Sequence, residues 1–417
     1  MEYGCIGEKL THSFSKIIHN NLYDNYYELK EISKEDLPKF MEKSDFKAIN
    51  VTIPYKEAVI PFLDYISDMA KEIGAVNTIV KKDGKLYGYN TDFLGMTDLI
   101  EINQISLKDK KVLILGSGGT SKTAWAVAKS QGAKLVLKVS RSEKSGFVTY
   151  EKAVKEHNDA QIIINTTPCG MFPNIGKSAL EIDGFTKLSA VIDAVYNPLS
   201  SDLVVKAKEK GIKAVGGLYM LVSQAVFAAE KFLDKKIPKE ETLRIYNQIL
   251  KDKINLVLIG MPGSGKTTIG KAIAKELSMD FIDSDDEIVK SQGVTIPKIF
   301  EDLGEVGFRE IESQIIKEIS SLQGRVIATG GGAVLNKRNI ELLKENGLVV
   351  FIDRPLDDIV VTDDRPLSSN RELLKKRYNE RYDIYKNSAD FVIKTEFDLQ
   401  RNITTLKEVF LNEIASY

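Results

Sequence analysis

Two glycine-rich segments of this 417-residue chain could each cradle phosphate, and they differ in design. The first is Gly116-Ser-Gly-Gly-Thr-Ser121, directly after the apolar run 112–115. The second is Gly260-Met-Pro-Gly-Ser-Gly-Lys-Thr267, directly after the apolar run 256–259. A buried strand that ends in a glycine-rich turn and opens a helix directs backbone N–H groups and the positive helix end at phosphate. Two such loops of different design predict two nucleotide-binding domains in one chain.

The first loop departs from the dinucleotide fingerprint G-x-G-x-x-G, because Ser121 stands at the third glycine position. Strand, loop and helix still follow in the order that dinucleotide binding requires. The residues expected to contact the cofactor here are Gly116, Ser117, Gly118, Gly119 and Thr120. The next predicted strand ends at Ser140, Arg141 and Ser142, where an NAD enzyme carries an acid for the ribose hydroxyls. An arginine between hydroxyls suits a 2′-phosphate and favours NADP, the alternative being a solvated loop arginine.

The second loop is a complete Walker A motif that follows a strand, and it indicates ATP or GTP. Its backbone cradles the β-phosphate, Lys266 reaches the β- and γ-phosphates, and Thr267 can ligate Mg²⁺. The residues expected to bind this nucleotide are Gly263, Ser264, Gly265, Lys266, Thr267 and Thr268. Downstream, Asp283 and Asp285 lie on one face of a predicted strand end. One carboxylate, which we take as Asp283, could serve the metal through water, and the other could serve an acceptor hydroxyl.

Several short polar clusters could form substrate pockets. In the first part they are Ser13-Phe-Ser15, Asn50-Val-Thr-Ile-Pro-Tyr-Lys56, Asn77-Thr78 and Asn90-Thr-Asp92, and in the second part Phe308-Arg309-Glu310 and Ala328-Thr-Gly-Gly-Gly332. Each alone is more often a turn, a helix cap or a surface charge. Together, polar groups at strand ends beside a dinucleotide fold predict a pocket for a small, hydroxyl-rich acid. The three glycines predict close backbone approach to a ligand.

Strand-like and helix-like segments alternate along the chain, which predicts an α/β fold with mostly parallel sheets. We expect strands at 48–53, 133–139, 161–165 and 190–195, a hairpin at 78–89 turning at Asp83-Gly84, and helices at 92–101, 121–130 and 220–233. The segment 234–253 is charged and helical in character. The predicted boundary between domains therefore falls at 252/253.

Composition gives no support to other classes of protein. Lys+Arg 58 against Asp+Glu 59 offers no electrostatic case for nucleic acid or an anionic membrane. Two cysteines and three scattered histidines predict neither a disulfide framework nor a metal site built from them. The N-terminus lacks an apolar signal region, and no apolar run is long enough to span a bilayer. We expect a cytoplasmic enzyme with small-molecule partners, as a monomer or homodimer.

Residues 1–252 resemble shikimate dehydrogenase. The matching motifs are Ser13-x-Ser15, Asn50-Val-Thr-x-Pro-x-Lys56, Gly74-Ala-Val-Asn77-Thr, Asn90-Thr-Asp92, the Gly116 loop and Gly217-x-x-Met-Leu-Val-x-Gln224. The resemblance implies a two-lobed enzyme, with a substrate lobe at 1–92 and 217–252 and a Rossmann-like NADP-binding lobe at 93–216, that reduces 3-dehydroshikimate with NADPH. It makes Lys56 and Asp92 the acid–base pair. It further implies substrate contacts from Ser13, Ser15, Thr52, Lys56, Asn77, Asp92, Tyr196 and Gln224, with Gly217 near the nicotinamide. Tyr219 stands where many members have glycine, which bears on the details of the nicotinamide pocket.

Residues 253–417 resemble shikimate kinase, a P-loop parallel-sheet domain like the nucleoside monophosphate kinases. The matches are the Walker A motif, Asp283-x-Asp285, Gly307-Phe-Arg309-x-x-Glu312, Gly330-Gly-Gly332, Arg365-Pro-Leu367 and Glu380-Arg381-x-x-x-Tyr385. The resemblance implies MgATP-dependent phosphorylation of shikimate, with Lys266, Asp285 and Arg365 catalytic. The acceptor would be bound by Asp285, Arg309, Gly331, Gly332 and Arg381. The expected lid, 356–370, is short, and two aspartates precede Arg365 where members often have glycine or basic residues.

The resulting interpretation is a bifunctional enzyme of the pathway to chorismate and aromatic amino acids. Two alternatives stay open. One is a quinate/shikimate dehydrogenase that uses NAD, against which Arg141 without a strand-end acid argues. The other is a sensor that binds shikimate and nucleotide without turnover, although a sensor would need no acid–base pair.

Overall fold

The computed structural model describes residues 1–10, 14–23, 26–143, 145–359, 371–396 and 398–416. The chain divides into two compact units. Unit 1 contains 1–169, 178–197 and 206–246, and unit 2 contains 170–177, 198–205 and 247–417. Two short segments that precede the predicted boundary thus cluster with unit 2, and helix α9 (Lys239–Lys253) crosses from one unit to the other. The assignment of an activity to each predicted range stays a prediction.

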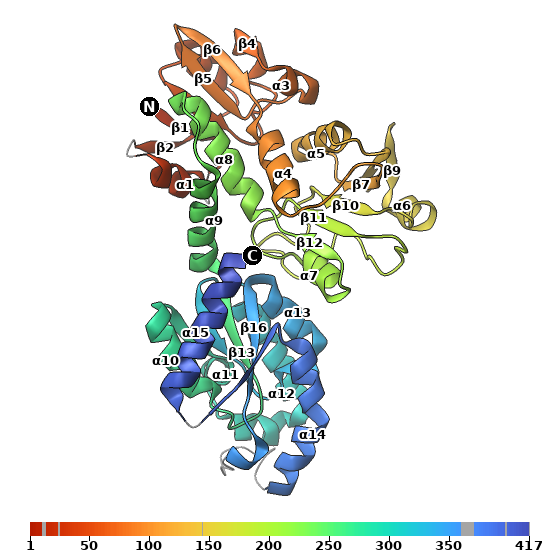
Figure 1. Cartoon of the computed structure of the whole chain (residues 1–417), viewed down its shortest axis with the longest axis vertical. Helices are drawn as coiled ribbons and strands as arrows, with labels where there is room; N and C mark the ends of the chain where they lie inside the picture. Colours follow the sequence, from red (N-terminus) through yellow and green to blue (C-terminus); the bar gives the residue numbers. More distant parts are fainter. Residues whose placement is uncertain (11–13, 24–25, 144, 360–370, 397, 417) are drawn as a thin grey trace. The chain divides into compact units, whose positions relative to one another are not determined.

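The first lobe of unit 1 is built on a mixed sheet in the order β2-β1-β3-β5-β6-β4 (Figure 1). Its strands are β1 (Tyr3–Gly7), β2 (Tyr27–Glu31), β3 (Ala48–Val51), β4 (Tyr65–Ile66), β5 (Thr78–Lys82) and β6 (Lys85–Tyr89). Its helices are α1 (Phe14–Leu22), α2 (Leu37–Lys43), α3 (Asp68–Ile73) and α8 (Leu218–Leu233), with a 3₁₀ turn at Ile60–Phe62. β5 and β6 form the predicted hairpin, because Asp83 and Gly84 both take positive φ values, 52° and 76°. The other pairings are parallel except β3 with β5.

The second lobe of unit 1 carries a wholly parallel sheet in the order β12-β11-β10-β7-β8-β9. Its strands are β7 (Lys111–Leu115), β8 (Leu135–Ser140), β9 (Phe147–Thr149), β10 (Ile162–Asn165), β11 (Ala190–Asp193) and β12 (Lys213–Val215). The helices of this part of the chain are α4 (Thr91–Ile102), α5 (Gly119–Ser130), α6 (Tyr150–Glu156) and α7 (Asp202–Glu209). The chain runs from β7 outward to β8, and returns to β10 on the other side. Gly116 therefore follows β7 at the point where the strand order reverses, which is where doubly wound sheets bind ligands.

Unit 2 is built on a five-stranded parallel sheet in the order β14-β15-β13-β16-β17. Its strands are β13 (Asn255–Ile259), β14 (Asp280–Asp283), β15 (Arg325–Ala328), β16 (Gly347–Asp353) and β17 (Phe391–Lys394). Its helices are α10 (Lys266–Leu277), α11 (Ser284–Gln292), α12 (Ile296–Ser320), α13 (Lys337–Asn346), α14 (Arg371–Ser388) and α15 (Leu399–Ser416), with 3₁₀ turns at Ala333–Leu335 and Leu356–Asp358. α12 is interrupted at Gly304, whose φ of 67° is not helical.

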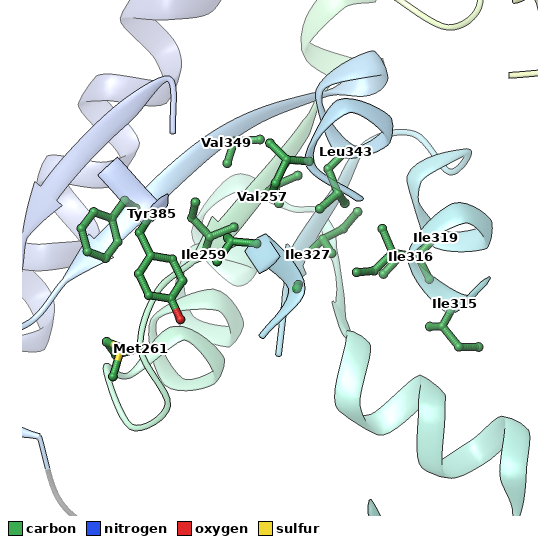
Figure 2. Packing of buried hydrophobic residues seen from close by; sticks show 14 of the residues in the cluster. Val257, Ile259, Met261, Ile315, Ile316, Ile319, Ile327, Leu343, Val349 and Tyr385 are labelled. Carbon is green, nitrogen blue, oxygen red and sulfur yellow. The ribbon is translucent and has the colours of Figure 1, made fainter. Parts of the chain in front are cut away.

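Apolar side chains from one face of β13 and its neighbouring strands pack with side chains of α12 in a core cluster of unit 2. Figure 2 shows Val257, Ile327 and Val349 from three adjacent strands packing with Ile316 of α12. These four side chains are fully buried. A strand that is buried on both faces has a continuous apolar sequence, and all five residues of β13 are buried, so its sequence alone predicts this strand. The loop after β13 is thereby fixed to the most buried strand of the unit.

His19 of α1 is buried between Tyr27 of β2 and Phe232 of α8. The ring of His19 stacks on Tyr27 at 4.2 Å between ring centroids and lies 5.5 Å from the ring of Phe232. Its Nδ1 forms a 2.8 Å hydrogen bond with Tyr23 Oη. Of the three histidines for which we predicted no metal or catalytic role, this one is a core residue, with no exposed surface. Burial lowers the pKa of its imidazole to about 3.

This imidazole predicts acid sensitivity of unit 1. The unfolded chain takes up a proton on His19 below pH of about 6.5, whereas the folded chain does so only near pH 3. The free energy of unfolding should therefore fall by about 1.4 kcal/mol per pH unit on acidification below pH ~6.5 through this group. Urea unfolding followed by fluorescence of Trp125, the one tryptophan, measures this slope. His19→Phe should reduce the slope of the unfolding free energy against pH by about 1.4 kcal/mol per pH unit. Tyr23→Phe keeps the imidazole and should leave the slope unchanged. Equal slopes in wild type and His19→Phe would contradict the prediction.

Candidate functional sites

Lys56 and Asp92, far apart in sequence, meet as an ion pair in unit 1. Lys56 Nζ donates to Asp92 Oδ2 at 2.6 Å. Lys56 lies in the turns that follow β3, and Asp92 is the second residue of α4, whose N-terminus is capped by Asn90 Oδ1 accepting from Phe93 N at 3.1 Å. The two side chains keep 24% and 16% of their surface exposed, so a ligand can reach them. The structure thus brings together the two residues predicted as an acid–base pair.

Asn77 fixes the start of α4. Its buried carboxamide accepts from Thr91 N at 2.7 Å and donates to Thr91 Oγ1 at 3.1 Å. Behind it, Asn50 Oδ1 accepts from Tyr27 Oη at 2.7 Å, and Asn50 Nδ2 donates to the carbonyl of Asn77 at 3.3 Å. These bonds hold the residue that precedes Asp92, so they orient the acid–base pair. A substrate contact from Asn77 stays a prediction.

The remaining substrate residues predicted in unit 1 lie on several elements. Tyr196 packs edge-on against Phe14, at 5.4 Å between ring centroids, and Phe14 opens the helix that carries Ser15. Thr52 follows β3, four residues before Lys56, and its amide donates to Ile6 O at 3.0 Å. Ser13 lies outside the described residues. Tyr196 therefore contacts the first residue of the helix that carries Ser15, and a pocket shared by Tyr196 and Ser15 stays a prediction.

In the loop after β7, Gly116 has a constrained backbone, whereas Gly118 and Gly119 have free space around them. Gly116 has a φ of 112°, and a Cβ there would lie 2.8 Å from Thr166 Oγ1. Around Gly118 and Gly119 no atom lies within 4 Å of an added Cβ, which leaves room for a ligand at the N-terminus of α5. Ser117 is exposed and Thr120 half-buried. The loop has the form that phosphate binding requires.

Two further segments of unit 1 were predicted to contact the dinucleotide, at 140–142 and at Gly217. The group Ser140, Arg141 and Ser142 follows β8, with Ser140 Oγ donating to Ser142 O at 2.5 Å and Arg141 exposed. Gly217 N donates to Val195 O at 2.8 Å, and a Cβ on Gly217 would lie 2.3 Å from the carbonyl oxygen of Ala194. Only glycine therefore fits at 217.

Gln224 and Tyr219 are both on α8, but they differ in their surroundings. Gln224 is half-buried, and its Nε2 donates to Leu221 O at 2.8 Å. Tyr219 is buried, packs against Tyr246 and donates from its hydroxyl to Asp98 at 3.0 Å. Tyr219, which departs from the glycine that the family resemblance led us to expect, therefore contributes to helix packing.

The Walker loop of unit 2 holds its lysine in place. Lys266 Nζ donates to the carbonyls of Gly260 and Met261 at 2.9 and 2.8 Å, and the side chain is almost fully buried. Gly260 has a φ of 151°, and a Cβ there would lie 2.8 Å from Ile352 O, so the loop turns tightly out of β13. Ser264 Oγ is buried without a hydrogen-bond partner in the described part of the chain. Gly263, Gly265 and Thr268 complete the loop and the first turn of α10.

The predicted metal residues of unit 2 are adjacent. Thr267 Oγ1 donates to Asp283 Oδ2 at 2.7 Å. A hydroxyl and a carboxylate are hard oxygen ligands of the kind that Mg²⁺ takes together with phosphate oxygens and water. Within the described ranges, no group of three or more His, Cys, Asp or Glu side chains could hold a metal by itself. The residues present fit a nucleotide-bound Mg²⁺ rather than an all-protein metal site.

The placement of Asp285 corrects the sequence interpretation. Asp283 is the last residue of β14 and caps α11 by accepting from Asp285 N at 3.0 Å, so Asp285 lies in the first turn of a helix and not on a strand face. A residue two positions after a strand end joins the next element when the first carboxylate is a good N-cap. Burial, followed by the charge of Asp283, raises the pKa of Asp285 to about 6. Its Oδ1 has no hydrogen-bond partner among the residues that the structure describes.

Three consecutive glycines bring the backbone against three site residues. An added Cβ at Gly330 would lie 2.6 Å from Asp285 Oδ1, at Gly331 2.6 Å from Pro262, and at Gly332 2.0 Å from Arg309 Nη1. The run therefore lies close to the phosphate loop and to two predicted substrate residues, and its close approach to a ligand stays a prediction. Any side chain on the loop would displace the group that it faces.

Arg309 and Arg381 both lie against this loop, and each has defined hydrogen-bond partners. Arg309 Nη1 donates to Glu312 Oε2 at 2.6 Å, and Glu312 is buried. Arg381 Nη1 donates to Gly331 O at 2.9 Å, and the hydroxyl of Tyr385 donates to the same carbonyl. Two arginines with defined partners beside the same glycine run could pair with a ligand carboxylate. Arg365 and most of the expected lid lie outside the described residues.

Sequence reasoning did not assign roles to several residues that build these sites. Glu312 and Tyr385 were quoted only as parts of motifs, although each fixes a predicted substrate residue or its loop. Tyr27 and Asp98 had no motif at all. Tyr27, Asp98 and Tyr385 act through contacts with distant parts of the chain, which only a structure could reveal, whereas Glu312 contacts Arg309 one helical turn away.

Fold and site together define the class of the protein: an oxidoreductase unit that binds a dinucleotide, joined to a P-loop kinase unit. Residues 5–79 match the model of the shikimate dehydrogenase substrate-binding domain, and residues 262–411 match the model of shikimate kinase. The chain is 39% identical to the shikimate dehydrogenase (NADP(+)) of Clostridium beijerinckii, over 59% of this chain and 96% of the relative. The chain belongs to the shikimate dehydrogenase family and also carries a shikimate kinase domain.

Solved structures agree with this assignment. A chorismate mutase/shikimate 5-dehydrogenase fusion protein from Clostridium acetobutylicum is similar with a TM-score of 0.56 and 35% identity, covering 59% of this chain and 96% of that one. Shikimate 5-dehydrogenase from Thermus thermophilus, in complex with NADP(H) and shikimate, is similar with a TM-score of 0.54 and 27% identity, covering 60% and 99%. Within the described ranges, no helix is both long and apolar enough to cross a membrane.

Proposed function

We propose that this enzyme catalyses two successive reactions: reduction of 3-dehydroshikimate to shikimate with NADPH, and phosphorylation of shikimate to shikimate 3-phosphate with MgATP. The observation that carries the proposal is the presence in one chain of the Lys56–Asp92 pair and of Asp285 beside a Walker loop. The product of the first reaction is the acceptor of the second. Because both cosubstrates are cytoplasmic metabolites, we propose that the enzyme works in the cytoplasm.

For the reduction, Lys56 is the proposed proton donor. NADPH supplies the hydride, and charge builds on the carbonyl oxygen as the hydride arrives. An ammonium group at this oxygen stabilises the charge and delivers the proton, and Asp92, 2.6 Å away, orients the ammonium. The hydroxyls of Ser13 and Ser15 would bind the ring carboxylate. Arg141 supports NADP as the cofactor, because it can pair with a 2′-phosphate.

For the phosphorylation, Asp285 is the proposed base. Its unpartnered Oδ1 is available to the acceptor hydroxyl, while Arg309 and Arg381 would pair with the shikimate carboxylate. Lys266 would stabilise the charge on the transferring phosphoryl group. Thr267 and Asp283 would hold Mg²⁺, which neutralises phosphate charge. Arg365 is proposed as a further contact of the phosphoryl group.

One mixture tests both activities. Purified full-length enzyme is incubated with 3-dehydroshikimate, NADPH and MgATP, and products are followed by mass spectrometry, with NADH in a parallel sample. We expect shikimate 3-phosphate, and faster reduction with NADPH than with NADH. Shikimate without its phosphate would refute the kinase half, and equal or faster reduction with NADH would refute the cofactor assignment. Absence of both products would favour the sensor alternative.

A further inference from the structure

The carboxylate of Asp98 connects three helices of unit 1. Its Oδ2 accepts from Tyr219 Oη at 3.0 Å and from Ser223 Oγ at 2.6 Å, both on α8. Its Oδ1 accepts from Lys239 Nζ at 2.8 Å, on α9. The Asp98 side chain is only 14% exposed, so its charge has lost most of its water and depends on these donors.

The two contacts with α8 are the stronger ones. Ser223 and Tyr219 are buried, whereas half of the Lys239 side chain is exposed and its ion pair is screened by solvent. Burial, and then the charge of Asp98, raises the pKa of the Tyr219 phenol, which therefore stays a donor. The Tyr219 ring also packs edge-on against Tyr246, with 5.3 Å between centroids. A glycine at 219 could make neither contact.

The helices that Asp98 joins also carry residues of the reductase site. Asp92 lies on α4 and Gln224 on α8, and the two helices run side by side (Figure 1). Between Asp92 and Asp98, a Cβ added to Gly95 would lie 2.8 Å from Gln224 Cβ. The backbones therefore touch opposite Gln224, and Asp98 lies about 9 Å further along α4 than Asp92. A slide of α8 along α4 would move Gln224 directly.

We propose that Asp98 is a positioning residue for the reduction. It fixes α8 against α4 and so sets the place of Gln224 relative to Asp92. The inference rests on the proposed function, because it takes Gln224 to contact a ring hydroxyl of the substrate. It goes beyond that function by giving a role to Asp98 and to Tyr219, neither of which is proposed as a substrate contact.

A double-mutant cycle in the full-length enzyme tests the inference. Asp98→Asn should lower kcat/KM for 3-dehydroshikimate by about 10- to 100-fold, with a rise in KM, because a displacement near 1 Å costs this much. In a Gln224→Ala background, Asp98→Asn should add less than about twofold, since both substitutions remove the same contact. The matched control is Asp234→Asn, which removes the exposed Lys82–Asp234 pair at the far end of α8 and should leave kcat/KM unchanged.

Tyr219→Phe gives a second, milder variant, because it removes one hydroxyl and keeps the ring; it should lower kcat/KM in the same direction. Fully additive effects of Asp98→Asn and Gln224→Ala, or no effect of Asp98→Asn, would overturn the proposal. Hydrogen exchange of amides 218–224 should accelerate in Asp98→Asn, and unchanged exchange would also overturn it. If wild type fails to reduce 3-dehydroshikimate, the proposed function fails, while the exchange data still decide whether Asp98 holds α8.

Discussion

Replacing Lys56 with methionine should lower the rate of NADPH-dependent reduction by at least about 100-fold, because positioned proton donors contribute 10²- to 10⁴-fold. Methionine keeps the length of the side chain and removes the ammonium that Asp92 binds at 2.6 Å. The carbonyl oxygen then has no donor at the position where its charge develops. Initial rates of NADPH oxidation with 3-dehydroshikimate measure the effect.

The kinase in the same molecule provides the internal reference for this variant. Phosphorylation of shikimate by the Lys56→Met sample should match wild type, which would show that the effect is confined to the reductase unit. Lys82→Met is the matched control, since Lys82 lies in the same lobe but pairs with Asp234 at the surface. A reduction rate within tenfold of wild type would mean that another group delivers the proton. Loss of both reactions would mean that the halves are coupled.

The nucleotide loops could be predicted from sequence because their signals are contiguous. The strands before Gly116 and Gly260 are short apolar runs, the glycine turns follow at once, and the helices begin within a few residues. The hairpin at Asp83-Gly84 is local in the same way. In each case every residue that determines the structure lies within one short segment, so the pattern is complete without tertiary contacts.

The arrangement around these loops depends on contacts between distant segments, and sequence could not specify it. The glycines 330–332 predict that the backbone lies close to another group. They do not predict that the groups are Pro262, Asp285 and Arg309. Asp285 was misplaced on a strand, because the capping of α11 by Asp283 competes with continuation of β14. The pairing of Lys56 with Asp92, by contrast, could be predicted, because the family motifs name both residues.

The phosphorylation should depend on pH through Asp285. Burial and the neighbouring Asp283 raise the pKa of its carboxyl to about 6, so the fraction that is ionised, and able to accept a proton, falls as pH drops below this value. We therefore expect kcat/KM for shikimate to decrease about tenfold per pH unit well below pH 6 and to be nearly constant above pH 7. The quantity to measure is kcat/KM for shikimate, since it reports the ionisation of the enzyme before shikimate binds.

Asp285→Asn tests whether this carboxylate is the base. The amide keeps the shape of the side chain but cannot take a proton, so kcat should fall by about 10²- to 10⁴-fold and the remaining rate should lose its dependence on pH near 6. Asp286→Asn is the matched control, because Asp286 is the next residue of α11 and is exposed. Reduction of 3-dehydroshikimate should be unaffected in both variants. If Asp285→Asn retained both the rate and the pH profile of wild type, the proton would have to leave the acceptor hydroxyl by another route. Glu312, which is buried and also lies against Gly330, would then be the first group to examine.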